Sequence, residues 1–268
     1  MDTPGEPAGF PRTVAVIGLG LIGGSLALRL REVGVHVVGI DIDLRAVEEA
    51  QARRAVDAGG VGLDLVGGAD LVIVATPLAQ VAPVGLAAAR RMRPGAILTD
   101  TGSVKVPVVA AISAALPGGV RFVGGHPMAG NEKQGMAAAD ASLLDGRPYV
   151  LTPTARTDPA AVATMRAVIA ALRMQPVVLD PVQHDELVAQ ASHLPYLVSL
   201  ALDRAIADDA RAVGGPTMRD MTRAARSPLA LWQEICRANR EAILRALVRF
   251  EAEVARLRRD VEEGVLGR

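Results

Sequence analysis

The stretch Thr13-Val-Ala-Val-Ile17 runs directly into Gly18-Leu-Gly-Leu-Ile-Gly23. A short β-branched run of this kind is typical of a buried parallel strand, and residues 25–32 behind it predict a helix. Residues 35–40 predict a second strand, and Asp41 lies at its end, 18 residues after the last glycine of the motif. A glycine motif between a strand and a helix, followed by an acid after the next strand, indicates a dinucleotide-binding βαβ unit.

The glycines of this motif have separate tasks. Gly18 permits the tight turn, Gly20 lets a pyrophosphate approach the backbone, and Gly23 lets the helix pack closely on the strand. The helix N-terminus offers N–H groups and the positive end of its dipole to the phosphates. Asp41 would accept hydrogen bonds from ribose hydroxyls and repel a 2′-phosphate, so we expect NAD. Arg45 lies near enough that NADP stays an alternative.

The alternation of strands and helices continues to about residue 180. We expect strands at 69–75, 96–99, 121–123, 149–152 and 176–179, and helices at 45–55, 81–92, 106–116 and 159–172. In a doubly wound sheet, ligands bind at the carboxyl ends of the strands. Because Asp41, Thr76, Ser103 and His126 each follow such an end, we expect them to face one crevice.

His126 stands in Val123-Gly-Gly-His-Pro-Met-Ala-Gly130. Glycines and a proline around a histidine predict a loop, from which the ring can point at a substrate. Histidine is suited to proton transfer near neutral pH. The alternative is a turn whose histidine only caps or packs.

After Asp180 the pattern changes to Ala, Leu, Arg and Glu without convincing strands, which predicts a helical second domain. We therefore expect a flexible lead at 1–12, a dinucleotide-binding domain at 13–180 and a helical domain at 181–268. Pro195 should kink a helix that opens at His184 or free one of its carbonyls. Residues 229–259 predict a long helical stretch, with apolar residues at roughly helical spacing.

A few polar residues of the helical half are candidates for a site. At 100° per residue, His184, Ser192 and Tyr196 share one broad helix face, whereas His193 points elsewhere. Arg223 could clamp a carboxylate in bidentate fashion, although a solvated surface arginine is the plainer interpretation.

The composition excludes several classes of protein. The formal net charge of the 268 residues is +0, which leaves no basic footprint for nucleic acid and no polybasic membrane signal. Cys236 is the only cysteine, so we expect no internal disulfide and no cysteine-based metal site, which suits a reducing cytoplasm. No signal peptide or transmembrane span is expected.

Taken together, the motifs resemble those of prephenate and arogenate dehydrogenases, the TyrA family of tyrosine biosynthesis. The residues that carry the resemblance are Gly18-Leu-Gly-Leu-Ile-Gly-Gly-Ser25, Asp41, Asp100-Thr-Gly-Ser-Val-Lys105, Gly124-Gly-His-Pro-Met-Ala-Gly130, Ser192-His-Leu-Pro195, and Asp220-Met-Thr-Arg223 with Trp232 downstream. They run in family order through nearly the whole chain. The resemblance implies an α/β protein: an N-terminal Rossmann-type doubly wound sheet plus a C-terminal all-helical domain that builds a homodimer.

The resemblance also implies an activity, the NAD-dependent oxidative decarboxylation of prephenate to 4-hydroxyphenylpyruvate by a cytoplasmic enzyme. His126 matches the catalytic histidine of the family, and Ser103 matches the serine that hydrogen-bonds near it. Arg223 matches the arginine that binds a substrate carboxylate. The other substrate-binding residues implied are Asn131, Ser192, His193 and Tyr196. The cofactor-binding residues implied are Gly18, Gly20, Leu21, Ile22, Gly23, Asp41, Thr76, Pro77, Thr101 and Gly102.

Two positions depart from the family pattern. Tyr196 stands where a second histidine is frequent, and Asn131 stands where threonine is common. The family places the first position near the substrate side chain, so the choice between prephenate, a keto acid, and arogenate, an amino acid, stays open. A relative that acts on 4-amino-4-deoxyprephenate is a further variant.

Two other classes of function compete with this one. A 3-hydroxyacid dehydrogenase would share the first domain but rely on a lysine in the helical half, whereas Lys105 and Lys133 are the only lysines and both precede Asp180. A non-catalytic NAD-binding redox sensor would need Asp41 and the glycines, but not His126, Ser103 and Arg223 together.

Overall fold

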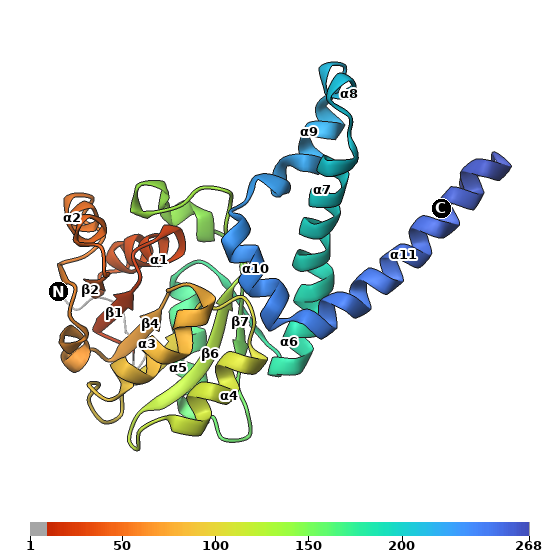
Figure 1. Cartoon of the computed structure of the whole chain (residues 1–268). Coiled ribbons are helices and arrows are strands. Elements are labelled where there is room, and N and C mark those ends of the chain that lie inside the picture. Colours follow the sequence, from red (N-terminus) through yellow and green to blue (C-terminus); the bar gives the residue numbers. More distant parts are fainter. Residues whose placement is uncertain (1–9, 268) are drawn as a thin grey trace. The chain divides into compact units, whose positions relative to one another are not determined.

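The computed structural model describes residues 10–267 and holds one eight-stranded sheet with helices around it (Figure 1). Of the flexible lead expected at residues 1–12, residues 1–9 lie outside the described part. The chain divides into two compact units, one that ends at His184 and one that begins at Asp185. The domain boundary expected near Asp180 stays a prediction. Among the described residues, no helix is both long enough and apolar enough to cross a membrane.

The sheet has the strand order β3-β2-β1-β4-β5-β6-β7-β8. Its strands are β1 (Thr13–Ile17), β2 (His36–Ile40), β3 (Ala58–Gly60), β4 (Leu71–Val74), β5 (Ile97–Asp100), β6 (Arg121–Pro127), β7 (Pro148–Thr152) and β8 (Gln175–Val178). The first six strands pair in parallel, which confirms the doubly wound Rossmann-type sheet. β7 runs antiparallel to β6, and β8 runs parallel to β7. Strand β3 was not predicted, because its Ala-Gly-Gly sequence has no β-branched or aromatic residue.

Helices of the first unit connect these strands. They are α1 (Leu21–Glu32), α2 (Leu44–Ala52), α3 (Leu78–Ala89), α4 (Val106–Ala115) and α5 (Pro159–Ala171), with short 3₁₀ segments η1 (Leu63–Gly68), η2 (Met136–Ala138) and η3 (Ala141–Leu144). The strands and helices enclose an aliphatic core, and β1 and β4 are buried on both faces, as a parallel sheet between helix layers requires.

Helix α1 begins at Leu21, four residues before the expected start at Ser25. Glycine disfavours helices, but packing requires glycines in these first turns. A Cβ on Gly23 would lie 1.8 Å from the carbonyl oxygen of Gly18, and a Cβ on Gly24 would lie 2.6 Å from the sulfur of Met136. Tertiary contact therefore overrides local propensity here.

The prediction that His126 lies on a loop is wrong, because His126 belongs to β6. Residues 121–123 of β6 pair with β5, and the strand then continues past the parallel sheet, where residues 124–127 pair with β7. Two glycines precede His126 because neighbouring atoms leave no room for a side chain at either position. A Cβ on Gly124 would lie 2.4 Å from Thr152 Oγ1, and one on Gly125 would lie 2.6 Å from the Asp100 carbonyl oxygen.

From Pro181 onward the structure is helical. Its elements are α6 (Pro181–Val188), the π-helical segment η4 (Ala189–His193), α7 (Leu194–Ala205), α8 (Asp208–Ala212), α9 (Pro216–Thr222), the 3₁₀ segment η5 (Arg223–Arg226), α10 (Leu229–Ala238) and α11 (Arg240–Glu263). Helix α6 begins before His184 because the Asp180 carboxylate accepts hydrogen bonds from the backbone N–H groups of Val182 and Gln183. The disturbance expected at Pro195 takes the form of the π-helical segment that directly precedes α7.

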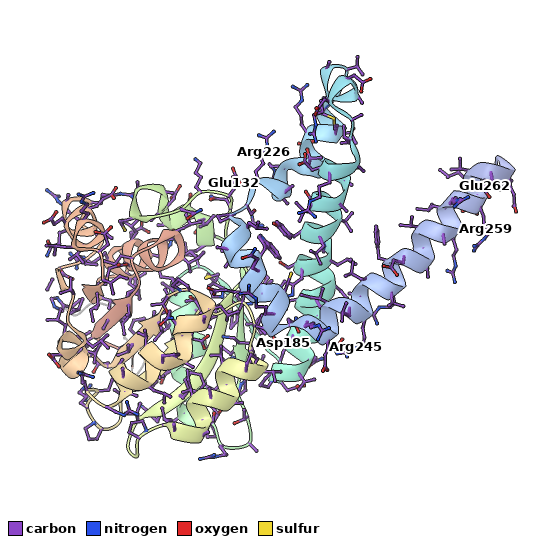
Figure 2. All side chains as sticks on the ribbon, in the orientation of Figure 1. Glu132, Asp185, Arg226, Arg245, Arg259 and Glu262 are labelled. Carbon is purple, nitrogen blue, oxygen red and sulfur yellow. The ribbon has the colours of Figure 1, made fainter. Side chains whose placement is uncertain are left out.

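The long helical stretch expected at 229–259 is divided into two helices, because the backbone leaves helical geometry at Asn239 (φ −114°, ψ 31°). The Asn239 side chain there donates a 2.8 Å hydrogen bond to the Asp185 carbonyl oxygen. Helix α11, which follows, buries Ala242, Ile243 and Ala246 near its start. Figure 2 shows side chains such as those of Arg259 and Glu262 standing out from its far end, where both are exposed.

Two arginines, one in α1 and one just after α2, form hydrogen bonds with residues 136–145, which follow β6. Arg29 of α1 is 3% exposed, donates to the Ala141 carbonyl oxygen at 2.9 Å and pairs with Asp145. Arg53, just after α2, donates to the Ala139 carbonyl oxygen at 2.7 Å. Residues 136–145 are thereby held against the first βαβ unit.

Arg29→Met should lower the free energy of unfolding by about 2–3 kcal/mol, because the Ala141 carbonyl and the Asp145 carboxylate lose a buried charged donor. Arg91→Met is the matched control. Arg91 is exposed and pairs with the exposed Asp64, so its loss should cost less than about 1 kcal/mol. Urea denaturation of both variants measures the difference, and equal losses would contradict the role given to Arg29.

Candidate functional site

Polar groups gather where the parallel strands end. Gly18 directly follows β1, Asp41 follows β2, Thr76 follows β4 by two residues and Ser103 follows β5 by three. His126 lies in the part of β6 that continues past its pairing with β5. Because these strands are parallel, their carboxyl ends lie at one edge of the sheet, the edge at which such sheets bind ligands.

The glycine motif forms a cradle that is open at one point. Gly18 has φ +95°, and a Cβ there would lie 2.5 Å from the Ala75 carbonyl oxygen, so the turn requires glycine. A Cβ on Gly20, in contrast, would meet no atom within 4 Å among residues 10–267. Within the same residues, no side chain caps α1 and no acid lies in its first turn. The N–H groups of α1 therefore suit an anionic group at Gly20.

Three more groups beside this cradle suit a dinucleotide. The two Asp41 carboxylate oxygens accept the N–H groups of Leu19 at 2.7 Å and Asp43 at 2.9 Å, which fixes the acid at the end of β2. The hydroxyl of Thr76 is buried and has no hydrogen-bond partner within the described chain. Thr101 donates its backbone N–H to the Val74 carbonyl oxygen at 3.0 Å, which fixes the turn after β5 beside the end of β4. The residues present thus fit the cofactor that the motif predicts.

A buried ion pair lies beneath the end of β6. Lys105 and Asp100 are both fully buried, and the Lys105 ammonium pairs with the Asp100 carboxylate. Lys105 also donates to the Gly125 carbonyl oxygen at 2.6 Å, and Asp100 accepts the N–H groups of Gly125 at 3.1 Å and Gly102 at 2.9 Å. The pair therefore holds the residue directly before His126 by both its N–H and its carbonyl group.

Neither member of this pair was predicted from the sequence to have a role of its own. The available signal was a lysine five residues after an acid at a strand end, where a mostly apolar run follows the lysine. A lysine is almost never fully buried without a charged partner, so its partner had to lie close by.

His126 has a second histidine beside it. Nδ1 of His126 lies 2.9 Å from Nε2 of His184, and the two rings meet edge to face at 68° with centroids 5.1 Å apart. His126 is half-buried, whereas His184 is fully buried. This contact could not be predicted from the sequence, since 58 residues separate the two histidines and only the fold brings them together.

Two other predicted residues, Ser103 and Asn131, lie in loops of the first unit. Ser103 is half-buried in the turn between Asp100 and Lys105, so the ion pair fixes its backbone on both sides. Its expected hydrogen bond near His126 stays a prediction. Asn131 is exposed, and its side-chain oxygen accepts the backbone N–H of Lys133 at 2.8 Å.

In the second unit, an aromatic cluster forms around Trp232. The Tyr196 ring stacks on Trp232 with centroids 3.6 Å apart, and the His193 ring meets the same indole edge-on at 6.0 Å. The prediction that His193 points away from Tyr196 is therefore wrong, because residues three apart on a helix are neighbours. Asn239 lies 3.2 Å from His193 Nδ1. Burial, with a smaller effect of Cys236, raises the pKa of the Tyr196 hydroxyl, so Tyr196 presents a neutral group.

The remaining predicted residues of the second unit are more accessible. Arg223 is the exposed first residue of η5, and the backbone N–H of Ala225 in the same turn donates to Ser199 of α7 at 3.0 Å. This bond fixes the turn that carries Arg223. Ser192, in the π-helical segment, is half-buried.

Comparisons with known proteins cover both units. The family model for "Prephenate dehydrogenase, nucleotide-binding domain" matches residues 26–183, and that for "Prephenate dehydrogenase, dimerization domain" matches residues 180–266. A prephenate dehydrogenase of Bacillus subtilis is 34% identical over 263 residues, which cover 94% of this chain and 70% of that protein.

Two solved structures are similar along the same length. Synechocystis arogenate dehydrogenase superposes with a TM-score of 0.80 and is 33% identical, covering 94% of this chain and 92% of that one. Prephenate dehydrogenase from Aquifex aeolicus, solved with hydroxyphenyl propionate and NAD+, has a TM-score of 0.86 and 28% identity, covering 94% and 91%. The similarity thus extends well beyond the glycine motif.

Lys105→Met should lower the free energy of unfolding by about 3–5 kcal/mol, because it leaves the Asp100 carboxylate buried without its counter-charge. Adding Asp100→Asn should recover part of that loss, since the uncompensated charge is then gone. Lys133→Met, at the other and exposed lysine, is the control and should change stability by less than about 0.5 kcal/mol. Equal stability of the single and double variants in urea denaturation would argue against the pair.

Gly20→Ala should leave the fold intact but weaken NAD binding at least about tenfold, because the added methyl group occupies the open point of the cradle. Gly62→Ala is the matched control, since a Cβ on Gly62 also meets nothing within 4 Å among the described residues. Calorimetric titration with NAD checks the affinity and thermal unfolding checks the fold. Unchanged affinity in Gly20→Ala would show that the phosphates do not approach here.

Proposed function

Because the chain belongs to the prephenate dehydrogenase family, we propose that it catalyses the NAD-dependent oxidative decarboxylation of prephenate to 4-hydroxyphenylpyruvate. The observation that best supports this proposal is the structural environment of His126. A half-exposed histidine is held on a rigid strand at the edge where a dinucleotide binds, and its backbone is fixed by a buried ion pair. A proton acceptor held there suits an oxidation at a carbon that bears a hydroxyl group.

His126 acts as the general base. Prephenate carries a hydroxyl at C4 and a carboxylate at C1 of its ring. A neutral imidazole takes the hydroxyl proton as the C4 carbonyl forms, and loss of the carboxylate as CO₂ makes the ring aromatic. The oxygen at C4 then becomes a phenol by regaining one proton, so the reaction releases no net proton from this group. Ser103, in the turn after β5, orients the hydroxyl or the imidazole.

The other proposed residues bind the substrate. Arg223 binds a carboxylate, because a planar guanidinium matches two carboxylate oxygens at once. Holding that end of the molecule limits the positions that C4 can take, which is how a clamp contributes to rate. Asn131, Ser192, His193 and Tyr196 are proposed as further substrate contacts.

The cofactor is proposed to be NAD. Gly18, Gly20 and Gly23 with the start of α1 would hold the pyrophosphate, and Asp41 the ribose, as in the fit described above. Asp43 adds a second carboxylate two residues after Asp41, and two negative charges there disfavour a 2′-phosphate. Leu21, Ile22, Thr76, Pro77, Thr101 and Gly102 complete the proposed set. When bound, the nicotinamide ring supplies the two-electron acceptor for the oxidation.

Arogenate is the second candidate substrate. It differs from prephenate only in the side chain, which carries an amino group in place of the keto group. Tyr196 stands where the family frequently has histidine, and its hydroxyl stays neutral because burial raises its pKa. A neutral hydroxyl can either donate or accept a hydrogen bond, so Tyr196 excludes neither the keto nor the amino side chain. The Synechocystis relative, an arogenate dehydrogenase, supports keeping this candidate.

A homodimer is proposed as the working form. The second unit matches a dimerisation domain, and the single chain exposes apolar side chains along α11. Val248, Leu257 and Val261 are 65%, 50% and 70% exposed, respectively. Exposed apolar surface of this kind is typical of a face that another chain covers.

The test measures NADH formation with prephenate and with arogenate, in wild type and in His126→Asn. We expect turnover of one substrate, with NAD faster than NADP, and a fall in kcat of about 10²- to 10⁴-fold in the variant, because asparagine cannot take the proton. NAD affinity should not change. His36→Asn, at an exposed histidine of β2, is the control and should keep full activity. Wild type that binds NAD but turns over neither substrate would overturn the proposal.

A further inference from the structure

We propose that His184 is a positioning residue that sets the tautomer and direction of the His126 ring. The inference rests on the function proposed above for His126 and adds a residue that the family resemblance did not assign. Its basis is the 2.9 Å approach between Nδ1 of His126 and Nε2 of His184. Only one of these two nitrogens carries the shared proton, so the pair has two possible arrangements.

The two arrangements differ in what His126 can do. If Nδ1 of His126 carries the proton and donates a hydrogen bond to Nε2 of His184, then Nε2 of His126 is unprotonated and can accept the substrate's hydroxyl proton. If His184 donates instead, neutral His126 carries its own proton on Nε2 and cannot act as a base there. Catalysis therefore requires His184 to be the acceptor, with its own proton on Nδ1.

His184 is held firmly enough to impose this choice. It is fully buried and lies in the first turn of α6, where its backbone N–H donates to the Asp180 carbonyl oxygen at 2.9 Å. The Asp180 carboxylate caps the same turn through the N–H groups of Val182 and Gln183. A buried side chain on a capped turn has little freedom to rotate away.

Other ionisable groups near His126 fix its backbone. Asp100 of β5 and Lys105 after it bind the N–H and carbonyl groups of Gly125, and the fully buried Tyr149 of β7 pairs in register with Pro127. The Tyr149 hydroxyl stays neutral because burial raises its pKa. These contacts fix the position of the His126 backbone, and the contact with His184 fixes the orientation of the His126 ring.

Three substitutions of His184 distinguish a positioning role from a purely structural one. His184→Leu removes the acceptor, and we expect kcat to fall about 10- to 100-fold while KM for NAD and KM for the ring substrate that is turned over each change less than about twofold. His184→Gln keeps an acceptor oxygen and should retain kcat within about fivefold. His184→Glu adds a negative charge, which favours protonated His126 and should move the acid limb of the kcat profile up by about one pH unit.

A direct readout does not depend on turnover. Full-length protein labelled with ¹⁵N-histidine, with His126 assigned through His126→Asn, reports by NMR which nitrogen of His126 carries the proton. We expect the Nδ1–H form in wild type and His184→Gln, and a shift toward Nε2–H in His184→Leu. Thermal unfolding of each variant identifies any loss of fold.

The outcomes are distinct. An unchanged His126 tautomer in folded His184→Leu, or a His184→Gln variant as slow as His184→Leu, would overturn the positioning role. If wild type turns over neither prephenate nor arogenate, the proposed function fails. The NMR comparison still decides the role of His184 in that case, because the tautomer is measured without substrate.

Discussion

The arrangement of the first unit depends on one buried ion pair. Lys105 and Asp100 are both fully buried, and a charge in that position is costly unless a partner and hydrogen bonds satisfy it. The Gly125 carbonyl oxygen and the N–H groups of Gly102 and Gly125 meet this requirement. Any shift of β6 away from β5 would break several of these bonds at once. The electrostatic requirement thus fixes the position of the strand that carries His126.

Strand β7, which is antiparallel to β6, supports His126 beyond the part of β6 that pairs with β5. Parallel pairing with β5 covers only the first three residues of β6, and a strand that ended there would leave His126 on a mobile connection. Antiparallel pairing with β7 carries the strand on through His126. The close contacts of Gly124 and Gly125 show how tightly these backbones meet. The position of a functional side chain is defined more precisely on a strand than on a loop.

The two units contribute different chemistry. The first carries the open glycine cradle, the acid at the end of β2 and the paired histidines. The second carries the Tyr196–Trp232 stack and the exposed Arg223. In the proposed function, the first unit supplies cofactor binding and the base, and the second supplies recognition of the substrate's carboxylate and side chain. In that proposal, the departure of Tyr196 from the family pattern concerns which substrate is chosen and leaves the proton transfer unaffected.

The sequence by itself determined the doubly wound sheet, the cradle at Gly20 and the helical character of the second half. These follow from local patterns: β-branched runs, glycine spacing and helical composition. It predicted most strand ends to within two residues, but it placed His126 on a loop. Only the tertiary structure showed the reversed β7, the burial of Lys105 and the contact with His184. Each of these joins residues distant in the chain or depends on burial, and local sequence patterns do not encode which distant groups meet.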